Sequence, residues 1–223
     1  MNIYLPKRSI VVLSGAAGSG KTTFARRFFA PSQILSSDFC RKLIADRVDW
    51  SPHLSPAAFR VLHTILEERL RLGKLTVIDS TAVLAVHRAI YLKIARRFNV
   101  RSALIVLDIP DKVCIERDRR RSQPVGHGAI TTQWELLQQG LEKVHEEGFG
   151  SVHILNERNQ FNSNIIIGDP RKDIQTPKTI IESPVSIPSP AAPTNGRSLN
   201  GKSKNSKTKT TSPLRQSKSK SSR

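Results

Sequence analysis

The chain has 223 residues, with 36 lysines and arginines against 18 aspartates and glutamates, which gives a formal net charge of +18. This excess of positive charge favours a polyanionic partner such as nucleic acid, a nucleotide or an anionic membrane surface. No apolar run approaches the ~20 residues needed to span a bilayer, so we predict no membrane-spanning segment. The chain has only two cysteines, which lie far apart in the sequence and show neither metal-ligand spacing nor a disulfide framework. We therefore expect a cytoplasmic protein.

The positive charge is concentrated in the C-terminal part of the chain. Residues 171–223 carry 12 basic and 2 acidic residues, hold 6 of the 13 prolines and 11 serines, and have no aromatic residue. Such a segment cannot bury enough apolar surface to offset the entropy lost on folding, so we predict a disordered basic tail. Residues 1–170 are long enough to form one globular domain.

Apolar segments that alternate with amphipathic segments predict a regular succession of strands and helices in residues 1–170. The run Ser9–Ser14 is short, apolar and rich in β-branched residues, as in a strand buried on both faces of a parallel sheet. Further strands are predicted at 33–36, 75–78, 102–107 and 152–155, with a small addition at 165–167. Helices are predicted at 21–30, 39–47, 56–72, 83–98, 112–121 and 131–147.

The helix predicted at 56–72 has the clearest boundary signals. Pro56 suits the first helical position, and Gly73 suits the position that follows the last turn. Four apolar residues at helical spacing predict a face that packs into the core: Phe59, Leu62, Leu66 and Leu70.

Strands that alternate with helices predict right-handed βαβ crossovers and a parallel sheet covered by helices on both faces. In sheets of this kind, ligands bind beyond the carboxyl ends of the strands. We therefore expect the functional residues to follow directly after the predicted strands.

The first predicted strand is followed by a phosphate-binding motif. The stretch Gly15-Ala16-Ala17-Gly18-Ser19-Gly20-Lys21-Thr22 matches G-x-x-x-x-G-K-[ST] in full, and a helix follows it. Its glycines let successive backbone N–H groups face a polyphosphate, and the helix N-terminus adds partial positive charge. We expect Lys21 in a solvated pocket where it reaches the β- and γ-phosphates of ATP, and Thr22 as a ligand of Mg²⁺. A glycine-rich turn without a ligand is the alternative.

This phosphate-binding motif, or P-loop, occurs in several classes of nucleotide-binding protein. The chain has no Asn-Lys-x-Asp motif for guanine recognition, which argues against a GTPase. A domain of this length is also small for a motor ATPase. A small kinase with a P-loop NTPase-type α/β fold is therefore favoured.

Polar residues follow the second and third predicted strands. Asp38 is placed at the carboxyl edge of the sheet, where it could accept a proton from an acceptor hydroxyl. Arg41, one helical turn further on, could bind an acceptor phosphate. The alternative is that Ser37 or Asp38 only caps the helix and that Arg41 is a solvated charge. Asp79 stands in a Walker B-like position, where it could hold Mg²⁺ or bond to Thr22, or else only form a turn.

An arginine-rich segment follows the fourth predicted strand. Arg117 and Arg121 share one face at helical spacing, and Arg120 lies near that face. Arginines in this place are positioned like a lid over the γ-phosphate, where they neutralise charge on a transferring phosphoryl group. A solvated basic face is the alternative.

Together these motifs resemble the kinase module of bacterial polynucleotide kinase-phosphatases, an N-terminal part of longer RNA-repair enzymes. The resemblance covers roughly residues 1–157 and is carried by residues 15–22, 34–41 (ILSSDFCR), 75–81 (LTVIDST), 113–121 and 147–149. It implies an ATP- and Mg²⁺-dependent kinase for the 5′-hydroxyl end of RNA or DNA, with further repair proteins as candidate partners. It also implies that Asp38 is the general base, that Arg41 binds the acceptor-strand phosphate, and that Arg117 contacts the ATP phosphates.

The chain departs from this family at three places. Its third-strand motif is Asp79-Ser80-Thr81-Ala82 where the family usually has Asp-Ala-Thr-Asn, and its lid loop at 121–127 lacks a further Asp-Arg pair. The basic tail stands where the family has phosphatase and ligase domains. A small-molecule kinase for a sugar, nucleoside or antibiotic is therefore the second hypothesis. A nucleic-acid-binding protein with a regulatory nucleotide site is the third.

Overall fold

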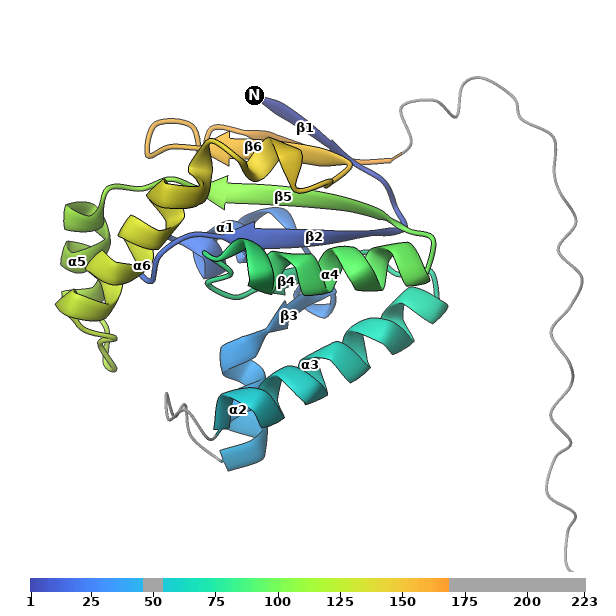
Figure 1. The fold of residues 1–223 in the computed structure, drawn as a ribbon, viewed down its shortest axis with the longest axis horizontal. Coiled ribbons are helices and arrows are strands. Elements are labelled where there is room, and N and C mark those ends of the chain that lie inside the picture. The colour runs from blue at the N-terminus through green and yellow to red at the C-terminus, as the bar shows by residue number, and fades with distance from the viewer. Residues whose placement is uncertain (46–53, 169–223) are drawn as a thin grey trace, which may run out of the picture. The chain divides into compact units, whose positions relative to one another are not determined.

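The computed structural model describes residues 1–45 and 54–168. The basic tail and its boundary at residue 170 lie outside the described residues and stay predictions, as does the end of the helix predicted at 39–47. The strands are β1 (Asn2–Leu5), β2 (Ser9–Ser14), β3 (Ile34–Ser36), β4 (Thr76–Asp79), β5 (Arg101–Leu107), β6 (Ser151–Leu155) and β7 (Asn164–Ile167) (Figure 1). The α-helices are α1 (Lys21–Phe28), α2 (Ser37–Ala45), α3 (Leu54–Arg71), α4 (Ala85–Arg97), α5 (Asp111–Arg119) and α6 (His127–Leu141).

Five strands form one parallel sheet in the order β3-β4-β2-β5-β6. The chain passes from β2 to β3 and β4 on one side, and then crosses to β5 and β6 on the other side of β2. This reversal is a topological switch point, where α/β sheets bind ligands beyond the carboxyl ends of their strands. It places the loop after β2 at the middle of the carboxyl edge. The predicted parallel α/β sheet is therefore confirmed.

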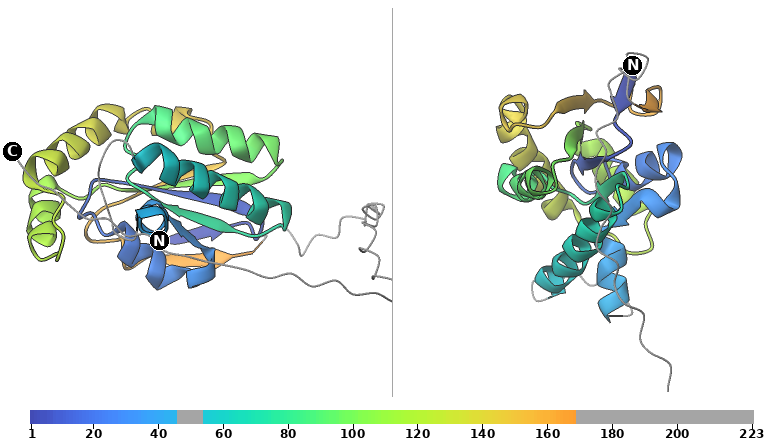
Figure 2. Two further views of the ribbon diagram at one scale, coloured as in Figure 1. Left: turned by 90° about the horizontal axis from the view of Figure 1, so that it is seen from below. Right: turned by 90° about the vertical axis from the view of Figure 1, so that its right-hand side faces the viewer.

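Helices cover both faces of the sheet, as the sequence predicts (Figure 2). Ile10 and Val12 of β2 pack with residues of α2, α3 and α4, whereas Val11 and Leu13 pack with α1 and β1 on the other face. Every residue of β2 is buried, which explains its continuous apolar sequence. No helix in the described part of the chain is long and apolar enough to cross a membrane.

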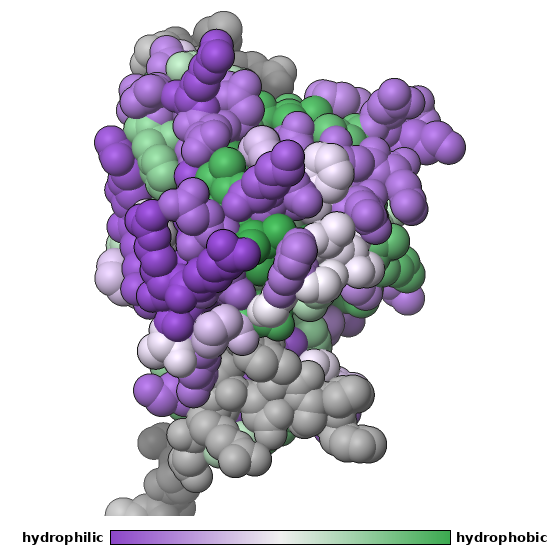
Figure 3. Space-filling model, turned by 90° about the vertical axis from the view of Figure 1, so that its left-hand side faces the viewer, coloured by the Kyte–Doolittle hydropathy of each residue, from purple (hydrophilic) through white to green (hydrophobic). Residues whose placement is uncertain are grey.

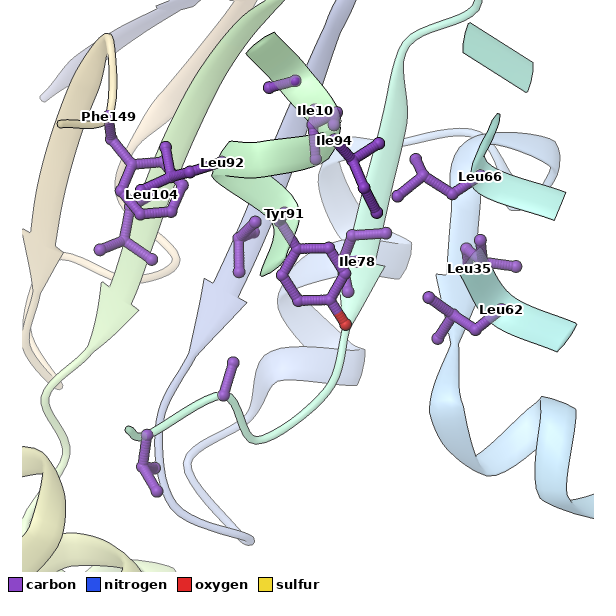
Figure 4. Close-up of a cluster of buried hydrophobic side chains, with 14 of the residues drawn as sticks. Ile10, Leu35, Leu62, Leu66, Ile78, Tyr91, Leu92, Ile94, Leu104 and Phe149 are labelled. Atoms are coloured by element: carbon purple, nitrogen blue, oxygen red, sulfur yellow. The ribbon is translucent and has the colours of Figure 1, made fainter. Parts of the chain in front are cut away.

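The core between the sheet and the α3–α4 layer is drawn in Figure 4. Tyr91 of α4 points toward Ile78 of β4, and Leu92 lies near Leu104 of β5. All of these side chains are at most 5% exposed. The core therefore holds the carboxyl ends of the central strands in fixed positions beneath the site described below.

The helix α3 matches its prediction at one end and differs at the other. It begins at Leu54, two residues before Pro56. Gly73 has a φ of +67°, a left-handed conformation that suits the position after a helix and favours glycine. Phe59 is only partly buried, whereas the rest of the predicted core face is fully buried: Leu62, Leu66 and Leu70.

The strand β1 was not among the predicted elements. It pairs in parallel with β7 in a separate two-stranded sheet. Ile3 and Leu5 are fully buried while Asn2 and Tyr4 are exposed, so an alternating pattern is present in the sequence. Four residues give only a weak signal, and the pairing partner lies at the other end of the described chain.

The helix α6 begins at His127 rather than at the predicted residue 131, and ends at Leu141 rather than at 147. A buried side chain explains the early start. Asp118 Oδ2 accepts hydrogen bonds from the backbone N–H groups of Val125 (2.9 Å) and Gly126 (3.0 Å) and so fixes the chain just before the helix. After α6 the chain turns into a short 3₁₀ segment, Val144–Glu146.

Candidate functional site

A cavity of about 750 Å³ opens at the carboxyl edge of the sheet. Its walls come from the P-loop, from the segments after β3 and β4, and from α3, α4 and α6. The cavity brings together most of the side chains predicted as functional: Lys21, Thr22, Asp38, Arg41, Asp79 and Arg121. The surface at this end of the molecule, where α5 and α6 lie, is mostly hydrophilic, with apolar patches between the polar side chains (Figure 3).

The P-loop, residues 15–22, joins β2 to α1 and curls against the first part of α5. Gly18 has a φ of +83°, and a Cβ atom there would lie 2.2 Å from the carbonyl oxygen of Cys114. No other residue fits this position without moving α5. The glycine is therefore required by the close approach of the two backbones as well as by its dihedral angle.

Lys21 is buried, which corrects the expectation of a solvated pocket. Only 8% of the residue is exposed, and Nζ donates to the carbonyl oxygens of Gly15 (2.9 Å) and Ala16 (2.8 Å). Burial lowers the pKa of Lys21 to about 8, against the opposing effect of the nearby Asp79 carboxylate. The P-loop thus holds the amine with its own carbonyl groups.

Thr22 and Asp79 form a direct hydrogen bond between two elements of the site. Thr22 Oγ1, at the start of α1, donates to Asp79 Oδ2, at the end of β4, over 2.8 Å. Burial raises the pKa of the Asp79 carboxyl group, and the charge of Lys21 opposes this effect. Both side chains offer hard oxygen atoms, the donors that Mg²⁺ prefers, and this ion usually keeps waters and phosphate oxygens as its other ligands. The pair therefore fits the predicted Mg²⁺ site, although the described residues hold no cluster of three or more His, Cys, Asp or Glu.

Asp38 and Arg41 form an ion pair on the first turn and a half of α2. Asp38 Oδ1 lies 2.8 Å from Arg41 Nη1, and the Asp38 side chain is half-exposed while that of Arg41 is nearly buried. Arg41 Nη2 also donates to Ser55 Oγ over 3.3 Å, and the guanidinium lies over the ring of Phe59 at 5.7 Å from its centroid. The backbone N–H of Phe39, at the start of α2, donates to Ser36 Oγ rather than to the Asp38 carboxylate. Asp38 is thus placed at the cavity by its partner Arg41.

The two predicted lid arginines reach the P-loop region from different places. Arg117 Nη1 donates to the carbonyl oxygen of Ser19 over 3.4 Å. Arg121 lines the cavity, with Nε 3.6 Å from Asp118 Oδ1. The predicted shared helical face is wrong, because α5 ends two residues before Arg121. Arg120 is mostly exposed and pairs with a neighbouring glutamate on α5.

A buried arginine that the sequence analysis missed fixes the segment after β4. Arg88 of α4 is 1% exposed, and Nη1 donates to the carbonyl oxygens of Ala82 (2.8 Å) and Val83 (2.7 Å). Its Nε donates to Glu147 Oε2 over 2.8 Å, and Nη2 pairs with the other carboxylate oxygen. The carbonyl oxygen of Ala82 also accepts from Ser14 Oγ over 2.9 Å, so Arg88 ties this segment to the start of the P-loop.

A second missed residue connects α6 to the P-loop. Gln133 Oε1 accepts the backbone N–H of Ala17 over 2.8 Å. Neither Gln133 nor Arg88 stands after a strand or within a motif, so each resembles an ordinary helix residue in the sequence. Only the packing of the helices on the carboxyl edge shows their role.

A family model described as AAA domain matches residues 10–144, which include the P-loop and all of the site residues named in this subsection except Glu147. The chain belongs to this AAA domain family. Its five-stranded parallel sheet, P-loop and flanking helices form a P-loop kinase-type, nucleotide-binding fold. The predicted fold class is therefore confirmed.

Solved structures resemble this chain to different degrees. A chain of the Pnkp1/Rnl/Hen1 RNA repair complex is 21% identical with a TM-score of 0.55, over 63% of this chain and 47% of that one. The AvrRxo1-ORF1:-ORF2 complex with ATP gives 13% identity and a TM-score of 0.53, over 67% of this chain and 55% of that one. The APS kinase CysC of Mycobacterium tuberculosis, in complex with AMPPNP and APS, gives 20% identity and a TM-score of 0.44, over 68% of this chain and 90% of that one.

The chain thus spans about half the length of the first two solved chains. At these identities the likeness establishes the fold alone. The resemblance to the kinase module of polynucleotide kinase-phosphatases is confirmed at this level. Comparison with curated proteins finds no match.

Proposed function

We propose that this protein is an ATP-dependent kinase that transfers the γ-phosphoryl group to the 5′-hydroxyl of RNA or DNA. One observation carries the proposal: Asp38 and Arg41 line the same cavity as Lys21, Thr22 and Asp79. A kinase of this kind needs a phosphate site and a base for the acceptor hydroxyl within one cavity.

The phosphate side of the proposed site consists of the P-loop and two arginines. The P-loop N–H groups, the start of α1 and Lys21 would bind the β- and γ-phosphates of ATP. Arg117 contacts Ser19 of the loop, and Arg121 lines the cavity. We propose that these two cations neutralise charge on the transferring phosphoryl group.

Thr22 and Asp79 are the residues proposed to hold Mg²⁺. When bound, the ion supplies charge neutralisation for the phosphate oxygens. The hydrogen bond to Thr22 and the backbone of β4 hold Asp79 in position. The segment after β4 is in turn fixed by Arg88.

Asp38 is proposed as the general base. It would take the proton of the acceptor hydroxyl as the oxygen forms a bond to the γ-phosphorus and the bond to the ADP oxygen breaks. Arg41 orients the Asp38 carboxylate through their ion pair. The same guanidinium is proposed to bind the phosphate that follows the 5′-terminal nucleoside.

A nucleic-acid end is the proposed acceptor for two reasons. The first is the resemblance of residues 34–41 and their neighbours to polynucleotide 5′-kinases, and the second is the net charge of +18, which favours association with a polyanion. A solved relative by fold is part of an RNA repair complex, so further repair proteins are proposed as additional partners.

An acceptor panel tests this function against its rivals. Radiolabelled ATP and Mg²⁺ would be incubated with RNA and DNA oligonucleotides that bear a 5′-hydroxyl, with their 5′-phosphorylated counterparts as controls, and with sugars, nucleosides and aminoglycosides. We expect label on the 5′-hydroxyl oligonucleotides alone. Label on a metabolite alone would establish the small-molecule kinase. Binding of ATP and oligonucleotide without any transfer would favour the regulatory nucleotide site.

A further inference from the structure

Three ring side chains form one wall of the cavity, and the proposed phosphoryl transfer does not use them. Phe59 and His63 are one helical turn apart on α3, with ring centroids separated by 6.0 Å. His63 meets Tyr91 of α4 edge to face, at 5.7 Å and 76°. All three residues line the same cavity as Lys21 and Asp38. We call these three residues the ring wall.

The ring wall is held at both ends by the proposed catalytic region. Tyr91 is 2% exposed and packs in the core beside Ile78 (Figure 4). Its hydroxyl group interacts with the side chain of Ser80, the residue after Asp79. At the other end, the Arg41 guanidinium lies over the ring of Phe59. The rings therefore stand in a fixed position between Asp79 and the Asp38–Arg41 pair.

The wall also explains why Phe59 departs from the predicted core face of α3. The other apolar residues of that face are fully buried, whereas Phe59 is partly buried and borders the cavity. His63 is half-buried, and burial lowers its pKa, so its ring is neutral at neutral pH. Neutral rings favour contact with another flat ring over contact with an anion.

The cavity thus has two chemically different parts. One part carries the cations Lys21, Arg41 and Arg121, and the other carries the ring wall. A ligand that satisfies both must combine an anionic group with a flat ring. An inorganic anion would leave the rings without a partner.

We propose that the ring wall binds the nucleobase of the acceptor's 5′-terminal nucleotide while Arg41 binds the phosphate on its 3′ side. This inference rests on the proposed polynucleotide kinase function and deepens it. The cavity then takes a complete nucleotide unit with its 5′-hydroxyl toward Asp38. Phe59 and His63 are the residues that distinguish an acceptor with a base from one without.

Binding of a minimal acceptor tests the inference without any need for turnover. Calorimetry would compare adenosine 3′-monophosphate with the 3-phosphate of 1,4-anhydroribitol, which is the same sugar phosphate without the base. Wild-type protein should bind the base-bearing compound about tenfold more tightly or better, the usual effect of stacking a base on aromatic side chains. Phe59→Leu and His63→Leu should each reduce the ratio of these two affinities toward one.

Two further variants separate a binding role from a structural one. Thr64→Ala, at an exposed neighbour of His63 on α3, should leave the ratio unchanged. His63→Phe, which keeps a neutral ring at this position, should keep the ratio of the two affinities near its wild-type value. A ratio that stays high in both leucine variants would overturn the inference, as would the absence of base-dependent binding in the wild type.

The kinase assay separates failure of this inference from failure of the proposed function. Equal transfer to 5′-hydroxyl oligonucleotides with and without a terminal base would end the inference and keep the function. Base-dependent binding of adenosine 3′-monophosphate without transfer to any 5′-hydroxyl end would end the function and keep the nucleotide-binding wall.

Discussion

Thr22 donates its hydroxyl hydrogen to Asp79 across 57 residues of sequence, with 2.8 Å between Oγ1 and Oδ2. The parallel pairing of β2 with β4 makes this contact possible, because it brings the end of β4 beside the P-loop. The bond connects the start of α1 to the neighbouring strand. It places two oxygen donors, one of them a buried carboxylate, at the wall of the cavity.

Asp79→Asn should weaken the dependence on Mg²⁺ without unfolding the protein. The amide oxygen still accepts from Thr22, but the carboxylate charge is lost. We expect the Mg²⁺ concentration at half-maximal rate to rise at least about tenfold. Since burial raises the pKa of Asp79, the ionised group costs stability above that pKa, and the variant should be at least as stable at neutral pH. Initial rates at increasing MgCl₂ concentration measure the Mg²⁺ dependence, and thermal melts measure the stability. Thr22→Ser is the control, because it keeps the hydroxyl group. An unchanged Mg²⁺ dependence in Asp79→Asn would exclude Asp79 as a ligand.

Lys21→Met should abolish transfer and change how the stability of the folded protein depends on pH. Lys21 has a pKa of about 8 when folded and 10.5 in an unfolded chain. The charged amine is therefore disfavoured in the folded state below pH 8, by up to about 3 kcal/mol. As pH rises from 8 to 10.5 the folded protein loses this proton first, so the wild-type protein should gain stability relative to the variant. Urea denaturation of both proteins across this range measures the difference in stability. A difference that stays constant over this range would contradict the buried position of Lys21.

Arg88→Met should strongly destabilise the protein, because it leaves Glu147 and two carbonyl groups without their buried partner. Removing one member of a buried ion pair costs about 3–5 kcal/mol. Glu147→Gln should cost less, since the amide oxygen can still accept a hydrogen bond. The matched control is Arg71→Met, which breaks an exposed pair with Glu68 and should cost under about 1 kcal/mol. Urea denaturation measures the free energy of unfolding of each variant. An equal loss of this free energy in Arg88→Met and Arg71→Met would show that the buried pair contributes no more to stability than the exposed pair.

Arg41→Ala should separate acceptors by their phosphate. For a 5′-hydroxyl acceptor with a phosphate on the 3′ side of its first nucleoside, we expect KM to rise about 10- to 100-fold, as for a lost charge-assisted hydrogen bond. For an acceptor without this phosphate, KM should change little, and kcat should fall equally for both because Asp38 loses its partner. Steady-state kinetics on the two acceptors measure this, with Arg60→Ala on the exposed side of α3 as control. An equal rise in KM for both acceptors would show that Arg41 does not bind that phosphate.

The parts of the site that follow strands could be predicted from the sequence. The P-loop, Asp38 and Asp79 each come directly after a short apolar run, and the parallel sheet brings these positions to one edge. The local sequence pattern is therefore enough to predict which residues lie at the carboxyl edge of the sheet. It also predicted the left-handed glycine after α3, because that geometry depends on neighbouring residues only.

The remaining features depend on contacts between distant segments. Lys21 is buried because its own loop and the neighbouring elements enclose it. The P-loop motif alone does not predict this burial. Arg88 and Asp118 resemble surface charges within helices, yet each satisfies backbone groups of another segment. The helix α5 ends before Arg121, so the spacing of the arginines alone gave the wrong geometry.

Transfer of label from ATP to a 5′-hydroxyl oligonucleotide by the wild-type and Asp38→Asn proteins tests most directly whether Asp38 serves as the base of a polynucleotide kinase. Asparagine preserves the size of the side chain and leaves Lys21, Thr22 and Asp79 in place. We expect kcat to fall by roughly 10²–10⁴, the usual contribution of a general base, with little change in ATP affinity or melting temperature. A wild-type protein that labels no 5′-hydroxyl end, or an Asp38→Asn variant with wild-type kcat, would contradict the proposed function.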